Sequence, residues 1–212
     1  VPGYPRAEIE DYNNKLNYQD NLIVAAEPFF LWAIEGGDAL KEKLPFHKTD
    51  LNVKIVDDIR PFKMIKVRIL TGAHTAMVPF SLLFGNKLVM ETVNGEFTGK
   101  FVNNVIGEIS ETLAMDKNEI TAYAEEVMDR FKNPFIKHAL ADIALNSISK
   151  FKVRVLPSLL GYYNTNKKLP VNLTFSLACL IQFYKGNWNN EVLPVKDTPE
   201  LVEAFKNAWQ LG

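Results

Sequence analysis

Cysteine is almost absent from this chain of 212 residues, which contains only Cys179. One thiol forms no intramolecular disulfide and supplies too few sulfur ligands for a thiolate zinc site. Its position inside the apolar run 173–181 predicts a core residue. The histidines and carboxylates show no metal-ligand spacing, so we expect no metal site. A reducing cytoplasm is the compartment we expect for such a chain.

Long hydrophobic runs and an excess of one charge are lacking as well. Asn172, Thr174 and Gln182 interrupt the best candidate for a membrane span, which falls short of the roughly 20 residues required. Lysine and arginine total 24 against 25 aspartates and glutamates, for a net charge of −1. We therefore expect no membrane and no nucleic acid as partners, and a small molecule as ligand. Because the chain opens on Val1 without a secretory leader, we expect it to belong to a longer polypeptide.

The spacing of apolar residues divides the chain into two parts. Residues 1–57 contain two strand-like runs, 22–34 and 52–56, with a short helix between them, and we interpret them as the end of an α/β domain and a connector. From residue 58 to 212 the spacing becomes helical, which predicts a mainly α domain. Its helices are expected from 58 to about 80 and over residues 97–113, 117–131, 135–149, 153–163, 172–185 and 199–209.

Two polar residues lie inside the first of these helices. Lys66 and His74 are eight residues apart, which at helical spacing places them about 80° around the helix and about 12 Å along it. Both can border one cleft that holds a small molecule. Gly72 costs a helix about 1 kcal/mol against alanine, which indicates close backbone packing or the approach of a ligand. Single lysines and histidines are usually solvated or structural, and we interpret His47 and His138 as surface residues.

The segment around Lys66 resembles the signature of the mannitol dehydrogenase family, which comprises long-chain polyol and sugar-acid dehydrogenases. That signature is lysine, four residues, asparagine, two residues, histidine; Lys66 and His74 fit it, and Thr71 stands at the asparagine position. Residues 26–35 (AEPFFLWAIE) and 130–137 (RFKNPFIK) are similar to two further family segments, in the expected order. Three more segments, 1–5, 72–75 and 147–158, look most like the tagaturonate reductase branch of the family.

The resemblance implies a two-domain enzyme. An N-terminal Rossmann domain would carry NAD, and a multi-helix C-terminal domain like that of 6-phosphogluconate dehydrogenase would supply the catalytic groups. Only the second is expected here, because no Gly-x-Gly-x-x-Gly follows a strand, and we expect no cofactor-binding residue in this chain. The Rossmann domain of the same polypeptide is then the partner of a helical domain that we expect to be truncated.

The resemblance also implies roles for individual residues. Lys66 is the acid/base that removes or returns the hydroxyl proton. His74 orients the substrate through a hydrogen bond. Thr71 lies near the oxyanion, where its hydroxyl is a shorter donor than the asparagine amide. A basic residue is expected to hold the substrate carboxylate, and we favour Lys150 and then Arg154. A basic helix end stabilised by the helix dipole explains these last two equally well.

These observations predict the catalytic C-terminal portion of an NAD-dependent oxidoreductase that interconverts D-tagaturonate and D-altronate. One alternative keeps the mechanism and changes the substrate, as in fructuronate reductase or mannitol 2-dehydrogenase. The other is a non-catalytic helical module that binds a ligand or another subunit, which a threonine at position 71 would suit. The chain alone is expected to be inactive, because hydride transfer needs the nucleotide domain.

Overall fold

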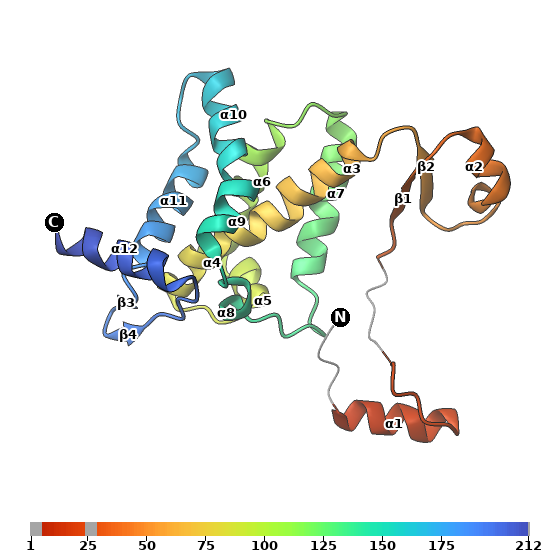
Figure 1. Cartoon of the computed structure of the whole chain (residues 1–212), viewed down its shortest axis with the longest axis horizontal. Coiled ribbons are helices and arrows are strands. Elements are labelled where there is room, and N and C mark those ends of the chain that lie inside the picture. Colours follow the sequence, from red (N-terminus) through yellow and green to blue (C-terminus); the bar gives the residue numbers. More distant parts are fainter. Residues whose placement is uncertain (1–5, 24–28, 212) are drawn as a thin grey trace. The chain divides into compact units, whose positions relative to one another are not determined.

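The computed structural model describes residues 6–23 and 29–211, and the chain divides into two compact units after Ile59 (Figure 1). The division predicted from the sequence, after residue 57, lies two residues earlier.

The first unit contains one separate helix and a small parallel sheet. Helix α1 spans Arg6–Leu16, and strands β1 (Trp32–Glu35) and β2 (Val53–Val56) pair in parallel. Helix α2 (Asp38–Lys43) and a 3-10 turn (Phe46–Lys48) connect the strands, as a parallel pair requires a crossover.

The strand predicted at residues 52–56 is confirmed by β2, whereas the run predicted at 22–34 was wrong over most of its length. Residues 22–23 and 29–31 form no strand, and residues 24–28 lie outside the described part of the chain. Only the end of that run, from Trp32, pairs with β2, because β2 is itself just four residues long.

The second unit is mainly helical, which confirms the predicted fold class. Its elements in chain order are α3 (Arg60–Ile65), a π-helical turn (Lys66–Thr71), α4 (Gly72–Phe84), α5 (Val89–Asn94), α6 (Glu96–Ser110), α7 (Lys117–Phe131), α8 (Leu140–Ile143), α9 (Ser147–Arg154), α10 (Leu156–Asn166), α11 (Val171–Phe183), the two-residue strands β3 (Asn187–Trp188) and β4 (Glu191–Val192), and α12 (Pro199–Gln210).

Helix α3, the π turn and α4 form one continuous helix of 25 residues at the centre of this unit (Figure 1). Helix α11 packs along α4, while α6, α7 and α9 contact the π turn. By length and composition this helix is apolar enough to cross a membrane. The expectation that the best candidate lies near residue 173 and falls short of the required length was therefore wrong. Ile69, Ala73 and Met77 have no exposed surface, so neighbouring helices cover its apolar face, as in the core helix of a helical domain.

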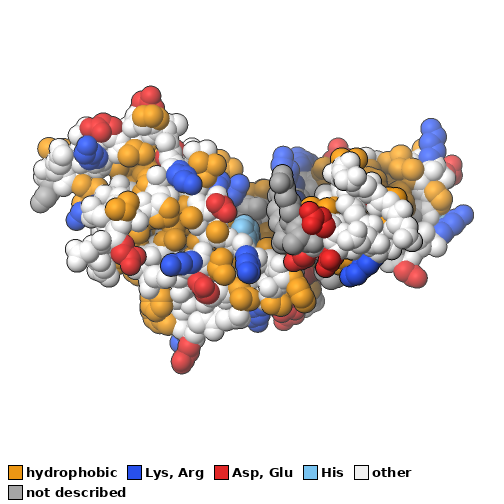
Figure 2. Space-filling model, turned by 90° about the horizontal axis from the view of Figure 1, so that it is seen from below, with side chains coloured by type: hydrophobic (Ala, Val, Ile, Leu, Met, Phe, Trp, Pro, Cys, Tyr) orange, Lys and Arg blue, Asp and Glu red, His pale blue; other side chains and the backbone are white. Residues whose placement is uncertain are grey.

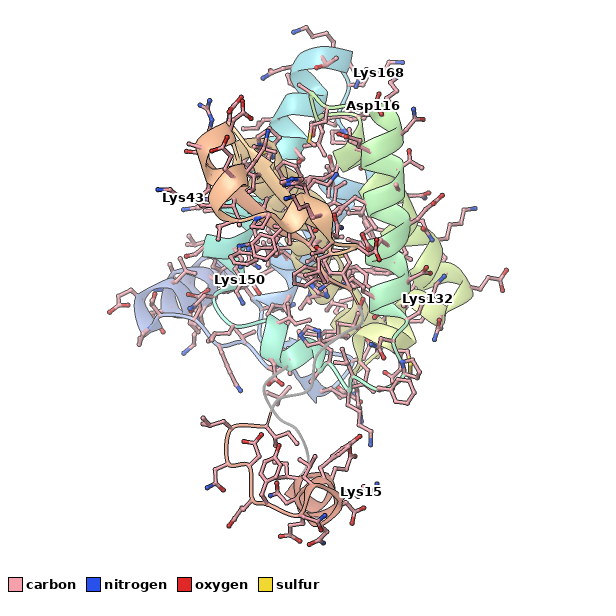
Figure 3. All side chains as sticks on the ribbon, turned by 90° about the vertical axis from the view of Figure 1, so that its right-hand side faces the viewer. Lys15, Lys43, Asp116, Lys132, Lys150 and Lys168 are labelled. Atoms are coloured by element: carbon pink, nitrogen blue, oxygen red, sulfur yellow. The ribbon has the colours of Figure 1, made fainter. Side chains whose placement is uncertain are left out.

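Side chains near the helix ends explain several boundaries. The Asp116 carboxylate accepts hydrogen bonds from the N–H groups of Asn118 and Glu119 at 2.9 and 3.2 Å, which caps α7 directly before its predicted first residue, Lys117. Asp116 and Lys132 lie at opposite ends of this helix (Figure 3). Helix α4 ends at Gly85, whose φ of +105° is favourable for glycine alone among common residues.

The helix predicted over residues 135–149 was wrong. The Asn133 side chain accepts a hydrogen bond from the N–H of Phe135 at 3.0 Å, which makes Asn133–Pro134 a turn instead of a helix start. Residues 132–139 contain no helix, α8 has four residues, and α9 begins only after Asn146, whose φ is +54°. Helix α5 and the β3–β4 hairpin were not predicted, because both are too short to show a period.

Candidate functional site

The π turn carries two of the predicted site residues, Lys66 at its start and Thr71 at its end. In a π-helix each N–H bonds to the carbonyl five residues back, so each residue turns the chain less than in an α-helix. The offset of about 80° that a regular α-helix leaves between Lys66 and His74 therefore shrinks. The two side chains lie closer to a common face of the helix than the sequence predicts, and that of Lys66 is exposed.

Gly72 follows the π turn and allows α9 to lie against it. A Cβ atom at this position would be 3.2 Å from the backbone oxygen of Arg154 and 3.5 Å from Cδ1 of Ile109. Of the two explanations predicted for Gly72, close backbone packing is the one observed. This packing places the last residue of α9 beside the turn that carries Lys66.

The hydroxyls of Thr71 and Thr75 bind the helix backbone. Thr71 donates to the carbonyl of Val67 at 2.7 Å, and Thr75 donates to the carbonyl of Thr71 at 2.8 Å. Arg154 donates from Nη1 to Oγ1 of Thr75 at 3.4 Å. A hydroxyl has one hydrogen to donate. In this arrangement Thr71 therefore has none for a substrate oxygen, and its predicted place near the oxyanion stays a prediction.

Aromatic and basic side chains surround His74. Its ring stacks on Phe131 with centroids 4.3 Å apart, and His138 meets it edge-on at 5.2 Å. Burial, and then the positive charges of His138, Arg130 and Arg154, lower the pKa of His74 to about 3. The imidazole is therefore neutral at pH 7, with one nitrogen that donates and one that accepts.

The Nε2 atom of His74 is buried and finds no hydrogen-bond partner among the described residues. Leaving a buried polar atom unpaired costs on the order of 1–3 kcal/mol, so native structures rarely do it without a reason. A ligand that meets Nε2 would remove this cost. The observation supports the predicted role of His74 as a substrate contact.

The two basic residues predicted to bind a carboxylate, Lys150 and Arg154, differ in their contacts. Arg154 binds Thr75, and its charge acts on His74. Lys150 lies one turn earlier on α9 (Figure 3), and its ammonium donates to the carbonyl of Ile143 at 2.9 Å. Burial, followed by the charge of Arg154, lowers the pKa of Lys150. The geometry therefore favours Arg154 ahead of Lys150, the reverse of the predicted order.

Apart from Arg154, the residues that surround His74 had no predicted role. Arg130 and Phe131 belong to the segment 130–137, and its similarity to the family was the one available signal. His138 was interpreted as a surface residue; it is exposed, yet its ring contacts His74. The loop 132–139 accounts for this, since it carries the chain from Phe131 at the end of α7 back to the same ring.

The positive charge near His74 is local. On the face shown in Figure 2, the Lys and Arg side chains of the helical unit are interspersed with Asp and Glu. The residues that the structure describes contain no group of three or more His, Cys, Asp or Glu side chains placed to hold a metal ion. What the arrangement offers is a neutral imidazole, a guanidinium and an amine, which suit a polyhydroxylated anion.

A cavity of about 350 Å³ lies at the other end of α4. Its walls are mostly aromatic and aliphatic and include Phe80, Phe84, Phe175 and Cys179. Cys179 is buried, as predicted, and burial raises the pKa of its thiol to about 11. This cavity therefore offers volume without an acid, a base or a thiolate at neutral pH.

Comparison with known proteins defines the class. Residues 58–211 match the family described as mannitol dehydrogenase C-terminal domain. The chain therefore belongs to the mannitol dehydrogenase family, and residues 58–211 are its C-terminal domain. It is similar to the altronate oxidoreductases of Pectobacterium atrosepticum (45% identity over 99% of this chain and 44% of the relative) and Bacillus subtilis (45% identity over 99% and 42%). The chain thus spans less than half the length of these relatives.

The fold is also that of a solved dehydrogenase. The ternary complex of Pseudomonas fluorescens mannitol 2-dehydrogenase with NAD and D-mannitol aligns over 97% of this chain and 41% of that chain, with a TM-score of 0.73. At 22% sequence identity, this likeness shows a shared fold. The family and the fold class predicted from the sequence are both confirmed.

Proposed function

We propose that the chain is the C-terminal catalytic portion of an NAD-dependent oxidoreductase that interconverts D-tagaturonate and D-altronate in the cytoplasm. The observation that carries the proposal is the 45% identity to altronate oxidoreductases over 99% of the chain. The site supports it, because the unpartnered Nε2 of His74 and the guanidinium of Arg154 lie near the turn that carries Lys66. A sugar acid presents a hydroxyl to the first and a carboxylate to the second.

Each side chain has a distinct task in this proposal. Arg154 binds the substrate carboxylate through charge-assisted hydrogen bonds. His74 binds a substrate hydroxyl through Nε2 and so fixes which carbon is presented for reaction. Lys66 takes the proton from the reacting hydroxyl during oxidation and returns one to the same oxygen during reduction.

NAD, which accepts or supplies the hydride, is expected on a Rossmann domain of the same polypeptide. The relatives are more than twice as long as this chain, which leaves room for such a domain. The pair β1–β2 also supports it, because parallel strands normally belong to larger sheets with both faces covered. This chain contributes the substrate side of the reaction.

The proposal is tested by NADH oxidation in the full-length polypeptide with tagaturonate, fructuronate and fructose. We expect tagaturonate to be the best substrate, and Lys66→Ala to lower kcat by about 10²–10⁴, the usual contribution of a general acid/base. Lys100→Ala, an exposed lysine on α6, is the matched control and should change kcat by less than about twofold.

Each other outcome points to a different alternative. Dominant turnover of fructose or fructuronate would replace the proposed substrate and keep the mechanism. Unchanged kcat in Lys66→Ala would remove the acid/base assignment. No turnover of any hexuronate or ketose by the full-length protein would favour the non-catalytic module.

A further inference from the structure

Arg68, two residues after Lys66 in the π turn, forms a hydrogen bond to α10. Its Nη1 donates a hydrogen bond to Oγ of Ser158, near the start of α10, at 3.0 Å. Ser158 has no exposed surface, and Arg68 is itself partly buried. Residues two apart on a helix face different directions, so Arg68 holds the turn from inside while Lys66 stays exposed.

The junction between α9 and α10, residues 154–158, meets the π turn and its C-terminal flank at three points. Ser158 accepts the hydrogen bond from Arg68. The carbonyl oxygen of Arg154 packs against Gly72, and the guanidinium of Arg154 donates to Thr75. The middle of the turn and the residues after it are therefore fixed to the same short segment. That segment also presents the guanidinium that we assign to the substrate carboxylate.

A π turn needs such support more than an α-helix does. Single π-helical turns are rare and occur frequently at functional sites, and a catalytic group displaced by 1 Å can lose about 10²-fold in rate. A hydrogen bond from a charged guanidinium to a fully buried hydroxyl is among the stronger interactions that can hold a short segment in place.

We propose that Ser158 is a positioning residue: by holding Arg68 it fixes the π turn so that Lys66 meets the substrate bound by Arg154. This inference rests on the proposed function. It makes the α9–α10 junction the element that sets the position of the acid/base relative to the carboxylate site.

The test is Ser158→Ala in the full-length polypeptide. We expect kcat for tagaturonate to fall about tenfold while KM changes less than about twofold, because the carboxylate site is intact and the acid/base is misplaced. Hydrogen–deuterium exchange at the amides of residues 66–71 should become faster, which reports on the turn independently of turnover.

Ser176→Ala is the matched control. Ser176 also has no exposed surface, and its hydroxyl donates to the carbonyl of Ala76 at 2.8 Å, on the same central helix but beyond the π turn. This variant loses a buried hydrogen bond to the same helix, so its melting temperature should also fall. Its kcat and its exchange at residues 66–71 should match those of the wild type.

A double-mutant cycle shows whether Ser158 acts through Arg68. If it does, adding Ser158→Ala to Arg68→Met leaves kcat at the value of Arg68→Met alone. Additive losses would overturn the proposal, and so would unchanged kcat in Ser158→Ala or an equal loss in Ser176→Ala.

The exchange measurement separates this inference from the proposed function. If the wild type turns over none of the sugars while exchange at residues 66–71 rises only in Ser158→Ala, the proposed function is wrong, and the proposal that Ser158 fixes the π turn is supported. If exchange in Ser158→Ala equals that of the wild type, Ser158 does not fix the π turn, whichever substrate the enzyme uses.

Discussion

At its N-terminal end, α4 carries His74 among Arg130, Arg154 and His138, with an imidazole nitrogen that is buried and unpaired within the described chain. At its C-terminal end, the ring centroid of Phe80 lies 6.0 Å from that of Phe84 and 5.9 Å from that of Phe175, and these three residues line an apolar cavity. The cavity end has volume and no group that moves a proton at neutral pH. The two ends therefore differ in the chemistry they offer. The N-terminal end holds a neutral imidazole among positive charges, whereas the C-terminal end holds an apolar cavity and the buried hydroxyl of Ser81, which also finds no partner among the described residues.

Among the effects that separate the two ends of α4, the largest is expected from a charge at the site end. Arg154→Met should raise KM for tagaturonate about 100-fold, because charge-assisted hydrogen bonds to a carboxylate contribute about 1.5–3 kcal/mol. Steady-state kinetics of the full-length polypeptide measure this. Lys152→Met, an exposed cation on the same helix, should change KM less than about twofold. An equal rise in KM for uncharged fructose would show that Arg154 does not act on the carboxylate.

The next effect is a pH dependence of stability caused by His74. Its pKa is about 3 in the folded chain, against an ordinary value of 6.5. As the pH falls below 6.5, the unfolded chain takes up a proton that the folded chain does not, so the free energy of unfolding falls by up to about 1.4 kcal/mol per pH unit until about pH 3. Above pH 6.5 this penalty is absent.

Urea unfolding at pH 7 and pH 4.5 checks this prediction. His74→Leu should lose the extra slope and be more stable than the wild type at pH 4.5, while the full-length polypeptide that carries it loses activity. His47→Leu, at an exposed position of the first unit, should keep the slope of the wild type. Parallel slopes for the wild type and His74→Leu would show that the folded state admits the proton.

A smaller effect distinguishes two glycines inside helices. At Gly107 an added Cβ meets nothing within 4 Å, so Gly107→Ala should stabilise the protein by about 0.5–1 kcal/mol. At Gly72 the same Cβ lies 3.2 Å from the Arg154 carbonyl, and Gly72→Ala should destabilise it by about 1 kcal/mol despite the helix propensity. Chemical denaturation of both variants measures the difference. Stabilisation by both substitutions would mean that α9 can shift away from Gly72 at little cost in free energy.

The smallest effect is expected at the cavity end. Cys179→Ser should change kcat by less than about twofold, because the thiol is remote from the site and its pKa of about 11 keeps it protonated at pH 8. Alkylation by iodoacetamide should accordingly be slow at pH 8 and accelerate toward pH 11. Rapid labelling at pH 8 would show an activated thiol and give the cavity a chemistry of its own.

Local signals predicted the parts of the fold in which one signal dominates. Helix α7 was predicted to the residue, because Asp116 caps its start and the apolar spacing continues to Phe131. The helix predicted over residues 135–149 was wrong, because the turn at Asn133 and the positive φ of Asn146 interrupt a pattern that looks helical. The π turn could not be predicted, because a search for helical periodicity assumes the same rotation at every residue.

The candidate site divides in the same way. Lys66, Thr71 and His74 could be named because one helix carries all three at a recognisable spacing. The packing of Phe131 and His138 on His74 could not be predicted, because separate segments meet there only in three dimensions. Spacing also does not show that a backbone carbonyl binds the hydroxyl of Thr71.

The π turn also makes the direction of the Lys66 side chain independent of the packing of α4. One residue added to a regular helix rotates everything beyond it by about 100°, whereas a π turn absorbs the added residue within itself. Helix α4 can thus keep its packing partners while the lysine before it acquires a new direction. A single deletion among residues 67–71 would therefore turn the Lys66 amine away from the face of the helix that carries His74. One residue of chain length then decides whether the amine and the imidazole border the same face.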